Sequence, residues 1–177
     1  AFAGHRLHFD GYLCDKALHA GADVQMDEAL TRIQHQSRLD RDVLVTTKGR
    51  YTFDYLIDAS GSLAHVGRLR HGDDEDYRPK DQVPTMYAQV QGNVPETFDV
   101  FLGSVAPSGY AWIIPKGPDT ANVGLGVRAG YLKGNLKEHL QEFCDELGFE
   151  ILSWGGGWIP MGGPVKTMVD GTTLAIG

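Results

Sequence analysis

Apolar and polar residues alternate along the segment APSGYAWIIPKG in the second half of the chain. Tyr110, Trp112 and Ile114 occupy every second position of this segment. A period of two is typical of a β-strand, because successive side chains of a strand point to opposite faces. The pattern therefore predicts a strand with these three side chains on one face, while Ala111 and Ile113 on the other face pack into the domain.

Further strand-like runs lie on both sides of this segment. They are PTMYAQVQG, TFDVFLG and ANVGLGVRA, and their even spacing predicts an antiparallel sheet. In the first half of the chain, EALTRIQHQSRL favours a strand over a helix. DVLVTT is followed by Lys48, Gly49 and then YTFDYLIDASG, which predicts a β-hairpin with a glycine turn. ADVQM and the final TTLAIG are interpreted as short strands.

Two segments have the spacing of helices. FDGYLCDKALHAGAD has apolar residues three and four positions apart, and Gly21 is expected to end this helix. LKEHLQEFCDELGF gathers its apolar residues on one stripe, formed by Leu136, Leu140, Phe143, Cys144 and Leu147. Residues 62–83 are polar and contain an acidic run, so we expect a solvated loop there. The stretch ILSWGGGWIPMGGPVKTM is expected to be irregular.

Composition and charge exclude several classes of protein. Apolar residues make up 42% of the 177 residues, which is enough for a packed core. The net charge of −7 and the pI near 5.4 argue against nucleic acid as a partner, because phosphate binding requires a basic surface. No apolar run is long enough to span a membrane, and none reads as a signal peptide. Because the sequence opens without methionine, we expect it to be a piece of a larger protein.

The usual motifs of catalysis and metal binding do not occur in this sequence, and no catalytic residue is assigned. His5 and His8 are not followed by further ligands at the spacing of a metal site, so no metal is expected. No serine lies in a GxSxG motif. Neither GxGxxG nor a P-loop occurs, so the chain does not contain the main phosphate loop of a dinucleotide-binding fold. Cys14 and Cys144 are expected to be free thiols.

Two segments rich in small residues are candidates for close approach of the backbone to a ligand. Residues 58–61 end an apolar strand with a small-residue turn, although many ordinary strands end in this way. WGGGWIPMGGP places five glycines beside Trp154 and Trp158, which indicates either backbone packed against a flat partner or a plain glycine loop. Lys116, at the end of a predicted strand, is either solvated or in contact with an anionic head group.

The order of these segments resembles the geranylgeranyl reductase family of FAD-dependent oxidoreductases. That family is related to the aromatic hydroxylases and to the electron-transfer flavoprotein dehydrogenases. The resemblance covers nearly the whole chain, and its most specific part is the family motif P-x-x-Y-x-W-x-F-P. Pro107, Tyr110, Trp112 and Pro115 match this motif. Ile114 replaces the usual phenylalanine, which keeps the face apolar but changes its shape.

The resemblance implies an α+β fold, as part of a FAD/NAD(P)-binding flavoprotein fold with an antiparallel-sheet substrate domain and without the N-terminal GxGxxG unit. The implied divisions are a part of the FAD-binding domain (1–62), a polar connection (63–82), the substrate domain (83–165) and a return strand (166–177). The implied FAD contacts are Arg6, Asp58, Ala59, Ser60, Gly61 and Gly177. Arginine suits such a position because its rigid fork binds phosphate oxygens. Without the phosphate loop, this chain alone is expected to bind FAD weakly or not at all.

The resemblance also implies a substrate and partners. The strand carrying Tyr110 and Trp112 is expected to wall a tunnel for a prenyl lipid or an isoprenoid diphosphate, which is reduced with hydride from the flavin. The implied substrate-binding residues are Pro107, Tyr110, Trp112, Ile114, Pro115, Trp158, Gly162 and Gly163. An external electron donor, a cytoplasmic location and peripheral membrane contact through the lipid are further expectations. The alternatives are a flavoprotein like the electron-transfer dehydrogenases or the aromatic hydroxylases, and a non-catalytic fragment that binds apolar ligands.

Overall fold

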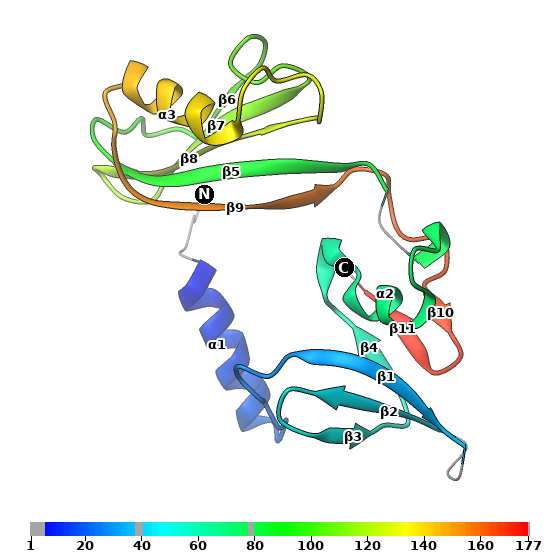
Figure 1. Ribbon diagram of the computed structural model, residues 1–177. Coiled ribbons are helices and arrows are strands. Elements are labelled where there is room, and N and C mark those ends of the chain that lie inside the picture. Colours follow the sequence, from blue (N-terminus) through cyan, green and yellow to red (C-terminus); the bar gives the residue numbers. More distant parts are fainter. Residues whose placement is uncertain (1–5, 38–40, 78–79, 177) are drawn as a thin grey trace. The chain divides into compact units, whose positions relative to one another are not determined.

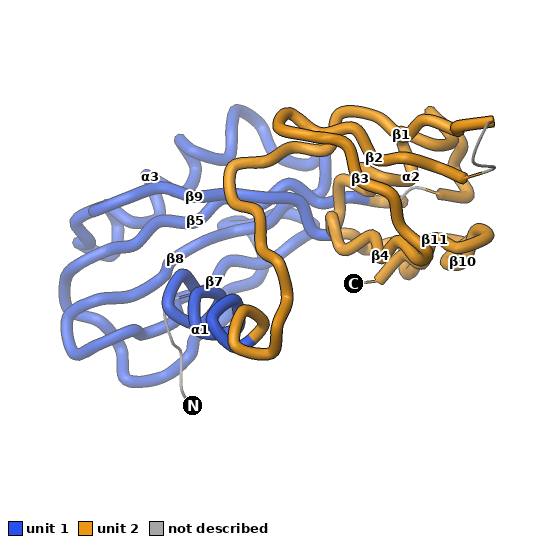
Figure 2. The backbone as a smooth tube through the Cα atoms, turned by 90° about the horizontal axis from the view of Figure 1, so that it is seen from below, with its two compact units in different colours: residues 1–16, 82–159 blue, residues 17–81, 160–177 orange. Residues whose placement is uncertain are grey.

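The computed structural model describes residues 6–37, 41–77 and 80–176 of the chain. The fold is mixed α/β, and the chain divides into two compact units (Figure 2). Unit 1 comprises residues 1–16 and 82–159, and unit 2 comprises residues 17–81 and 160–177. The domain boundaries expected from the family resemblance stay a prediction.

Unit 1 is built on a five-stranded sheet in the order β6-β7-β8-β5-β9 (Figure 1). Its strands are β5 (Gln82–Gln91), β6 (Asp99–Phe101), β7 (Gly109–Pro115), β8 (Thr120–Val127) and β9 (Glu150–Pro160). The pairs β6–β7, β7–β8 and β8–β5 are antiparallel. The strands predicted for PTMYAQVQG, TFDVFLG, GYAWIIP and ANVGLGVRA are therefore confirmed, together with their antiparallel pairing.

The helix α3 (Leu136–Glu146) has sequence signals at both ends. The Asn135 side chain accepts a hydrogen bond from the backbone N–H of Glu138 at 2.9 Å, which satisfies one of the free donors of the first turn. After the last turn, Gly148 adopts the left-handed conformation with φ +71°, which a residue without a side chain tolerates best.

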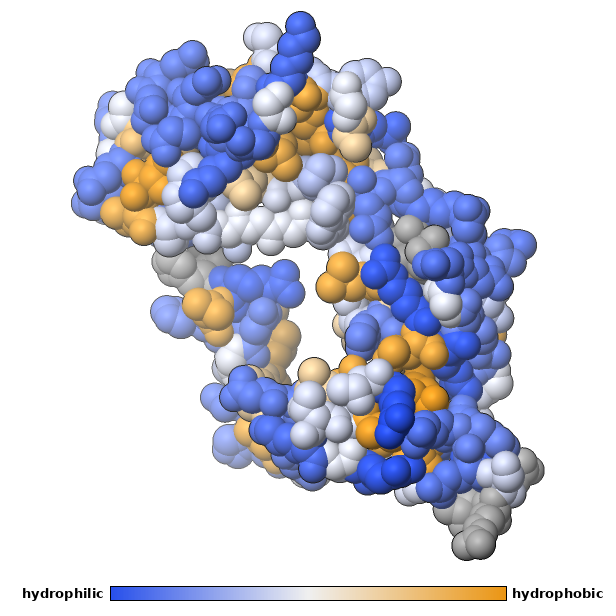
Figure 3. Space-filling view, in the orientation of Figure 1, coloured by the Kyte–Doolittle hydropathy of each residue, from blue (hydrophilic) through white to orange (hydrophobic). Residues whose placement is uncertain are grey.

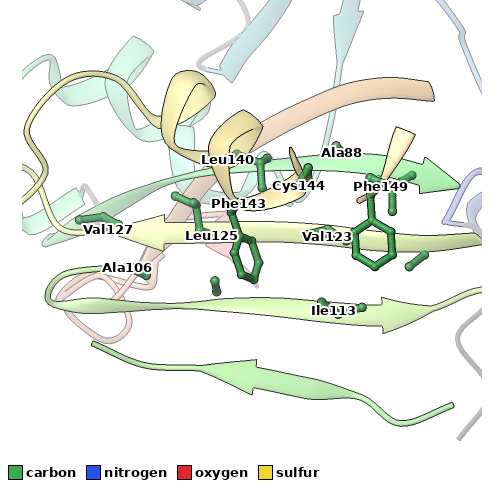
Figure 4. Close-up of a cluster of buried hydrophobic side chains, with 13 residues drawn as sticks. Ala88, Ala106, Ile113, Val123, Leu125, Val127, Leu140, Phe143, Cys144 and Phe149 are labelled. Carbon is green, nitrogen blue, oxygen red and sulfur yellow. The ribbon is translucent and has the colours of Figure 1, made fainter. Parts of the chain in front are cut away.

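The core of unit 1 lies between α3 and one face of the sheet (Figure 4). Leu140, Phe143 and Cys144 of α3 are buried, as their helical spacing predicts, whereas Leu147 is 39% exposed. The sheet contributes alternate residues of three strands: Ala88, Val90, Ala111, Ile113, Ala121, Val123, Leu125 and Val127. The intervening positions of these strands lie on the opposite face, which we call the open face.

The segment predicted to be irregular from its glycines is partly a strand: residues 151–160 belong to β9, whereas residues 161–168 are irregular as predicted. Residues 150–160 form one continuous strand beside β5. Two of its three glycines have neighbouring groups in the space that a side chain would occupy. A Cβ atom on Gly155 would lie 2.3 Å from the ring of Tyr87, and one on Gly156 would lie 2.9 Å from the Thr85 carbonyl oxygen. At these two positions glycine allows close packing within the sheet.

The helix α1 (Arg6–His19) confirms the helix predicted from FDGYLCDKALHAGAD. Gly21 follows it at φ +93°, and the Ala22 N–H donates to the Ala17 carbonyl at 3.0 Å, as in a helix C-terminal motif. No described residue of α1 is buried. The following segment ADVQM is not a strand, so that prediction is wrong. A strand requires a neighbour for its backbone hydrogen bonds, and the described residues provide none here.

Unit 2 contains two three-stranded sheets. The first has the order β1-β2-β3 and consists of β1 (Leu30–Gln36), β2 (Arg41–Thr46) and β3 (Arg50–Thr52). Its antiparallel pairs confirm the hairpin, whose turn is held by the Thr46 hydroxyl accepting the Gly49 N–H at 2.9 Å. The second has the order β10-β11-β4 and consists of β4 (Leu56–Asp58), β10 (Val169–Asp170) and β11 (Thr173–Ala175).

The segment YTFDYLIDASG was predicted as one strand, but it divides between the two sheets. Its first part is β3, and its second part is β4, which pairs in parallel with β11. A parallel pair joins segments that are distant in sequence, so local alternation gives no sign of it.

Residues 62–83 are not a continuous loop, which corrects the sequence-based prediction. They include the end of the short 3₁₀ helix η1 (Gly61–Leu63), the helix α2 (His65–His71) and the short 3₁₀ helix η2 (Glu75–Tyr77). Val66 is the one buried residue among those described in α2. The helix therefore lacks the repeating apolar positions by which a helix is predicted from sequence. The helix is instead held by polar contacts of Arg70 and His71 with other segments of unit 2.

Apolar side chains also reach the surface. On the face drawn in Figure 3, apolar patches interrupt the polar surface in both units. Among the described residues, no helix has the length and the apolar character needed to cross a membrane.

Both cysteines are free thiols, as expected. Burial, together with the Asp145 carboxylate, raises the pKa of the Cys144 thiol from 9.0 to about 11. The folded state therefore holds this proton more tightly than the unfolded state, and the resulting stabilisation is lost as the pH rises from about 9 to about 11.

We expect the free energy of unfolding in urea to fall less over this range in Cys144→Ala than in the wild type. Cys14→Ala should follow the wild type, and a Cys144→Ala profile parallel to the wild type would contradict the assignment.

Candidate functional site

The open face of unit 1 carries the strand residues that the family motif singled out. Trp112 of β7 pairs with Gly124 of β8. A Cβ atom on Gly124 would lie 2.4 Å from the indole ring, so the ring lies across the glycine instead of standing away from the sheet. The indole N–H donates to the Asn122 side-chain oxygen at 2.8 Å, which fixes the ring in this orientation. Trp112 is half-buried, and it is not part of the core beneath α3.

Two further aromatic rings lie on the same face. The Tyr110 ring lies 5.7 Å from the Trp112 ring between centroids, at an interplanar angle of 51°, and Tyr110 is 43% exposed. Tyr87 of β5 pairs with Gly124, and its ring covers Gly155 of β9. We call Tyr87, Tyr110 and Trp112 the aromatic floor. Such a surface can bind an extended apolar chain, because aromatic rings offer large contact areas with little loss of side-chain entropy.

Sequence reasoning did not identify Tyr87 as part of this site. Glycine inside a strand often marks the close approach of another group. At Gly155 of β9 that group is the ring of Tyr87. The glycines indicated that a flat group packs on this segment, but they did not show which residue provides it.

The other predicted substrate-binding residues have varied surroundings. Ile114 and Pro115 at the end of β7 are half-buried, as is Pro107 before it. Trp158 on β9 is 52% exposed. Gly162 and Gly163 belong to unit 2. The Gly162 N–H donates to the Lys80 carbonyl at 3.1 Å, and a Cβ atom on Gly162 would lie 2.7 Å from this oxygen, so contact with the backbone alone accounts for glycine there.

The predicted cofactor residues 58–61 lie at the carboxyl end of β4. Asp58 is 8% exposed and accepts hydrogen bonds from the backbone N–H of Ser60 at 3.0 Å and from its hydroxyl at 2.6 Å. The carboxylate therefore holds the turn, and any ligand contact falls to the exposed backbone that follows. Gly61 adopts φ +68°, with no atom within 4 Å of its Cβ position. Ala59, Ser60 and Gly61 are exposed.

This turn shares one edge of the sheet with the end of β11. Ala175 pairs with Asp58, and the Ile176 N–H donates to the Asp58 carbonyl at 2.9 Å. The carboxyl ends of neighbouring parallel strands are where α/β sheets usually bind ligands. The structure thus places two of the segments expected at the flavin side by side. Gly177, the next residue, lies outside the described residues.

Arg6 begins α1 in unit 1, so its expected role beside residues 58–61 of unit 2 stays a prediction. Its side chain is 87% exposed, and its Nε–H donates to the Asp10 carboxylate at 2.9 Å, one helical turn away. An exposed pair of this kind contributes little to stability. Of the paired histidines that were considered as ligands, His8 lies in the exposed part of α1, and His5 lies outside the described residues.

A separate cavity of about 490 Å³ lies in unit 2. Two of its charged lining residues are paired with each other, because the Arg70 guanidinium donates to the Asp42 carboxylate; it also donates to the Thr173 hydroxyl. Asp170 completes this network at 3.6 Å from Arg70 and 2.9 Å from His71. The network links β2, α2 and the β10–β11 hairpin, so its role is structural. None of the predicted site residues lines the cavity.

Comparison with known families gives a match to the geranylgeranyl reductase catalytic domain over residues 83–157. Among curated proteins, the chain is 35% identical to digeranylgeranylglycerophospholipid reductase 2 of Methanothermobacter thermautotrophicus, over 94% of this chain and 45% of the relative. It is 31% identical to the reductase of the same name from Methanosphaera stadtmanae, over 97% of this chain and 46% of that relative. The chain thus spans about half the length of these relatives.

Solved structures show the same fold. A geranylgeranyl bacteriochlorophyll reductase-like protein from Thermoplasma acidophilum matches with a TM-score of 0.82 at 21% identity, over 98% of this chain and 48% of that protein. A flavin-dependent brominase matches with a TM-score of 0.73 at 17% identity, over 98% of this chain and 48% of the brominase. The resemblance to the geranylgeranyl reductase family that the motifs indicated is therefore confirmed.

The packing of Trp112 on Gly124 can be tested by adding one methyl group. Gly124→Ala brings a Cβ atom against the Trp112 ring and within 2.8 Å of the Met86 carbonyl oxygen, which belongs to the backbone and cannot turn away. We expect a loss of about 1–3 kcal/mol in the free energy of unfolding in urea. Gly157→Ala on β9 is the control, because no atom lies within 4 Å of its Cβ position. Its effect should stay within about 0.5 kcal/mol, and equal effects of the two substitutions would refute the packing.

Proposed function

We propose that this chain, whose residues 83–157 match the geranylgeranyl reductase catalytic domain, is the substrate-binding part of a flavin-dependent reductase acting on prenyl lipids. The observation that carries the proposal is the aromatic floor. It lies within the matched residues, on the sheet face opposite the core. The names of the curated relatives support a glycerophospholipid with geranylgeranyl chains as the substrate.

The aromatic floor suits a prenyl chain in shape and in polarity. Trp112 has its one polar group bonded to Asn122, so the ring presents only apolar surface to a ligand. No charged residue lies among the twelve open-face positions of β5, β7 and β8: Val83, Thr85, Tyr87, Gln89, Gln91, Tyr110, Trp112, Ile114, Thr120, Asn122, Gly124 and Gly126. A floor of this kind would orient the chain and exclude water, as binding sites for apolar ligands do. Lys116, just beyond β7, suits contact with an anionic head group.

The residues at the edge formed by β4 and β11 fit a flavin cofactor. The exposed turn 59–61 has small residues, and the open space at Gly61 allows close approach of the cofactor. The Asp58 carboxylate is buried and accepts hydrogen bonds from Ser60, so it is held against the turn instead of facing a ligand. We infer that this turn and the end of β11 hold part of FAD; the contact of Arg6 with its phosphates stays a prediction from the family resemblance. When bound, FAD supplies the hydride chemistry that saturates a carbon–carbon double bond.

FAD affinity should depend on segments beyond this sequence. The chain contains no GxGxxG loop, whose backbone N–H groups and adjoining helix N-terminus normally hold the pyrophosphate. We expect the purified chain to be colourless, and added FAD to show no saturable fluorescence quenching at micromolar concentration. The protein extended to the length of its relatives is the positive control. A yellow preparation of this chain with stoichiometric flavin would overturn the expectation.

Trp112 and Ile113 are neighbours that point to opposite faces of β7, which makes them a matched pair for testing the floor. In the extended protein, Trp112→Ala should reduce turnover of a geranylgeranyl lipid by at least about tenfold, because the prenyl chain loses its largest contact with the protein. Its cost in stability should stay below about 2 kcal/mol, since the ring lies outside the core. Ile113→Ala should cost about 2–5 kcal/mol and leave the turnover of folded molecules nearly unchanged.

Urea unfolding and product analysis on both variants measure these effects. Unaltered turnover in folded Trp112→Ala, combined with a loss of several kcal/mol, would assign Trp112 to the core and would remove the main support for the proposed function. A different outcome is that the wild-type extended protein fails to reduce prenyl lipids and instead turns over an aromatic compound, by hydroxylation or halogenation. That result would indicate another chemistry on the same scaffold.

A further inference from the structure

The edge strand β6 has two faces of different character. Phe101 points toward α3, where its ring meets the Phe143 ring edge-on at 5.2 Å between centroids. The alternate residues Phe98, Val100 and Leu102 are 59%, 51% and 76% exposed. Three large apolar side chains in a row, all more than half exposed, are not explained by the core of unit 1.

The pairing register places this row beside the aromatic floor. Val100 pairs with Trp112, and Phe101 pairs with Ala111, which belongs to the core face. Val100 therefore lies on the open face next to Trp112. Phe98 and Leu102 flank β6 at the two positions that continue its alternation, and both are exposed. Neighbouring strands are about 4.8 Å apart, so the apolar row is in reach of any ligand that lies along Trp112.

The charge around this row favours an uncharged apolar ligand over a membrane surface. The open-face positions of β6, like those of β5, β7 and β8, carry no charged side chain among the described residues. Residues 93–99, which lead into the row, contain Glu96 and Asp99 and no lysine or arginine. An anionic bilayer attracts basic segments, so these carboxylates would oppose docking of this edge on lipid head groups.

We propose that Phe98, Val100 and Leu102 bind the part of the prenyl chain that extends past Trp112, and that they set the chain length the enzyme prefers. This inference rests on the proposed function, since it assigns a length-selecting surface to the same substrate. The β6 row and the aromatic floor form one continuous wall, with the floor holding the middle of the chain and the row holding its end.

Chain-length preference in the extended protein tests this assignment. The measurement is the ratio of kcat/KM for a geranylgeranyl substrate to that for the farnesyl analogue, which is one prenyl unit shorter. Val100→Trp occupies the space beside Trp112 and should lower this ratio by about tenfold. Leu102→Ala, which adds no bulk, should also lower it by reducing contact with the chain end. Asp99→Asn on the same strand, whose side chain lies on the other face, should leave the ratio unchanged.

A direct binding measurement separates this inference from the proposed function. Calorimetric titration with geranylgeraniol and farnesol, which does not depend on turnover, should show weaker geranylgeraniol binding in Val100→Trp. If prenyl substrates are reduced but both variants keep the wild-type ratio, the β6 assignment is wrong and the proposed function stands. If the wild type neither reduces prenyl substrates nor binds geranylgeraniol, both are wrong. If the variants change only binding to anionic phospholipid vesicles, β6 contacts the bilayer and the inference fails.

Discussion

The five-stranded sheet of unit 1 packs one face against α3, while its other face is partly exposed among the described residues, and the rest of the candidate site depends on this difference. Alternation along β7 and β8 sends Ala111, Ile113, Val123 and Leu125 into the core. The same alternation leaves Trp112 and its neighbours on the open face. A shift of one residue in the pairing would exchange the two faces, so the buried core residues fix the register of the whole wall.

Glycine shapes the open face as much as the aromatic residues do. Trp112 rests on Gly124, and Tyr87 rests on Gly155, because any side chain at these glycines would occupy the space of the rings. The rings consequently lie along the sheet and make a smooth apolar surface. Glycine weakens a strand, since it offers no side chain to pack and loses more entropy on folding. The burial of the two rings against the strand backbone offsets part of this loss of stability.

Unit 2 is held together by polar contacts as well as by apolar ones. Arg70 on α2 reaches Asp42 on β2, Asp170 on β10 and Thr173 on β11, so one side chain connects both small sheets. Arginine suits this role because its planar fork donates in several directions at once. With the sheets so fixed, β4 and β11 end side by side, which creates the edge proposed to hold the flavin.

The sequence by itself determined the elements whose signals are local: the alternation of β7, the apolar stripe of α3, the Gly21 stop of α1 and the family motif around Trp112. Only the tertiary structure decided that part of the glycine-rich segment belongs to the strand β9, that YTFDYLIDASG divides between two sheets and that α2 forms in a polar stretch. These outcomes depend on contacts with distant segments, such as Tyr87 over Gly155 or Arg70 with Asp42. Likewise, Tyr87 and Val100 joined the candidate wall only through strand pairing, because a residue's own neighbours in sequence do not reveal what lies across the sheet.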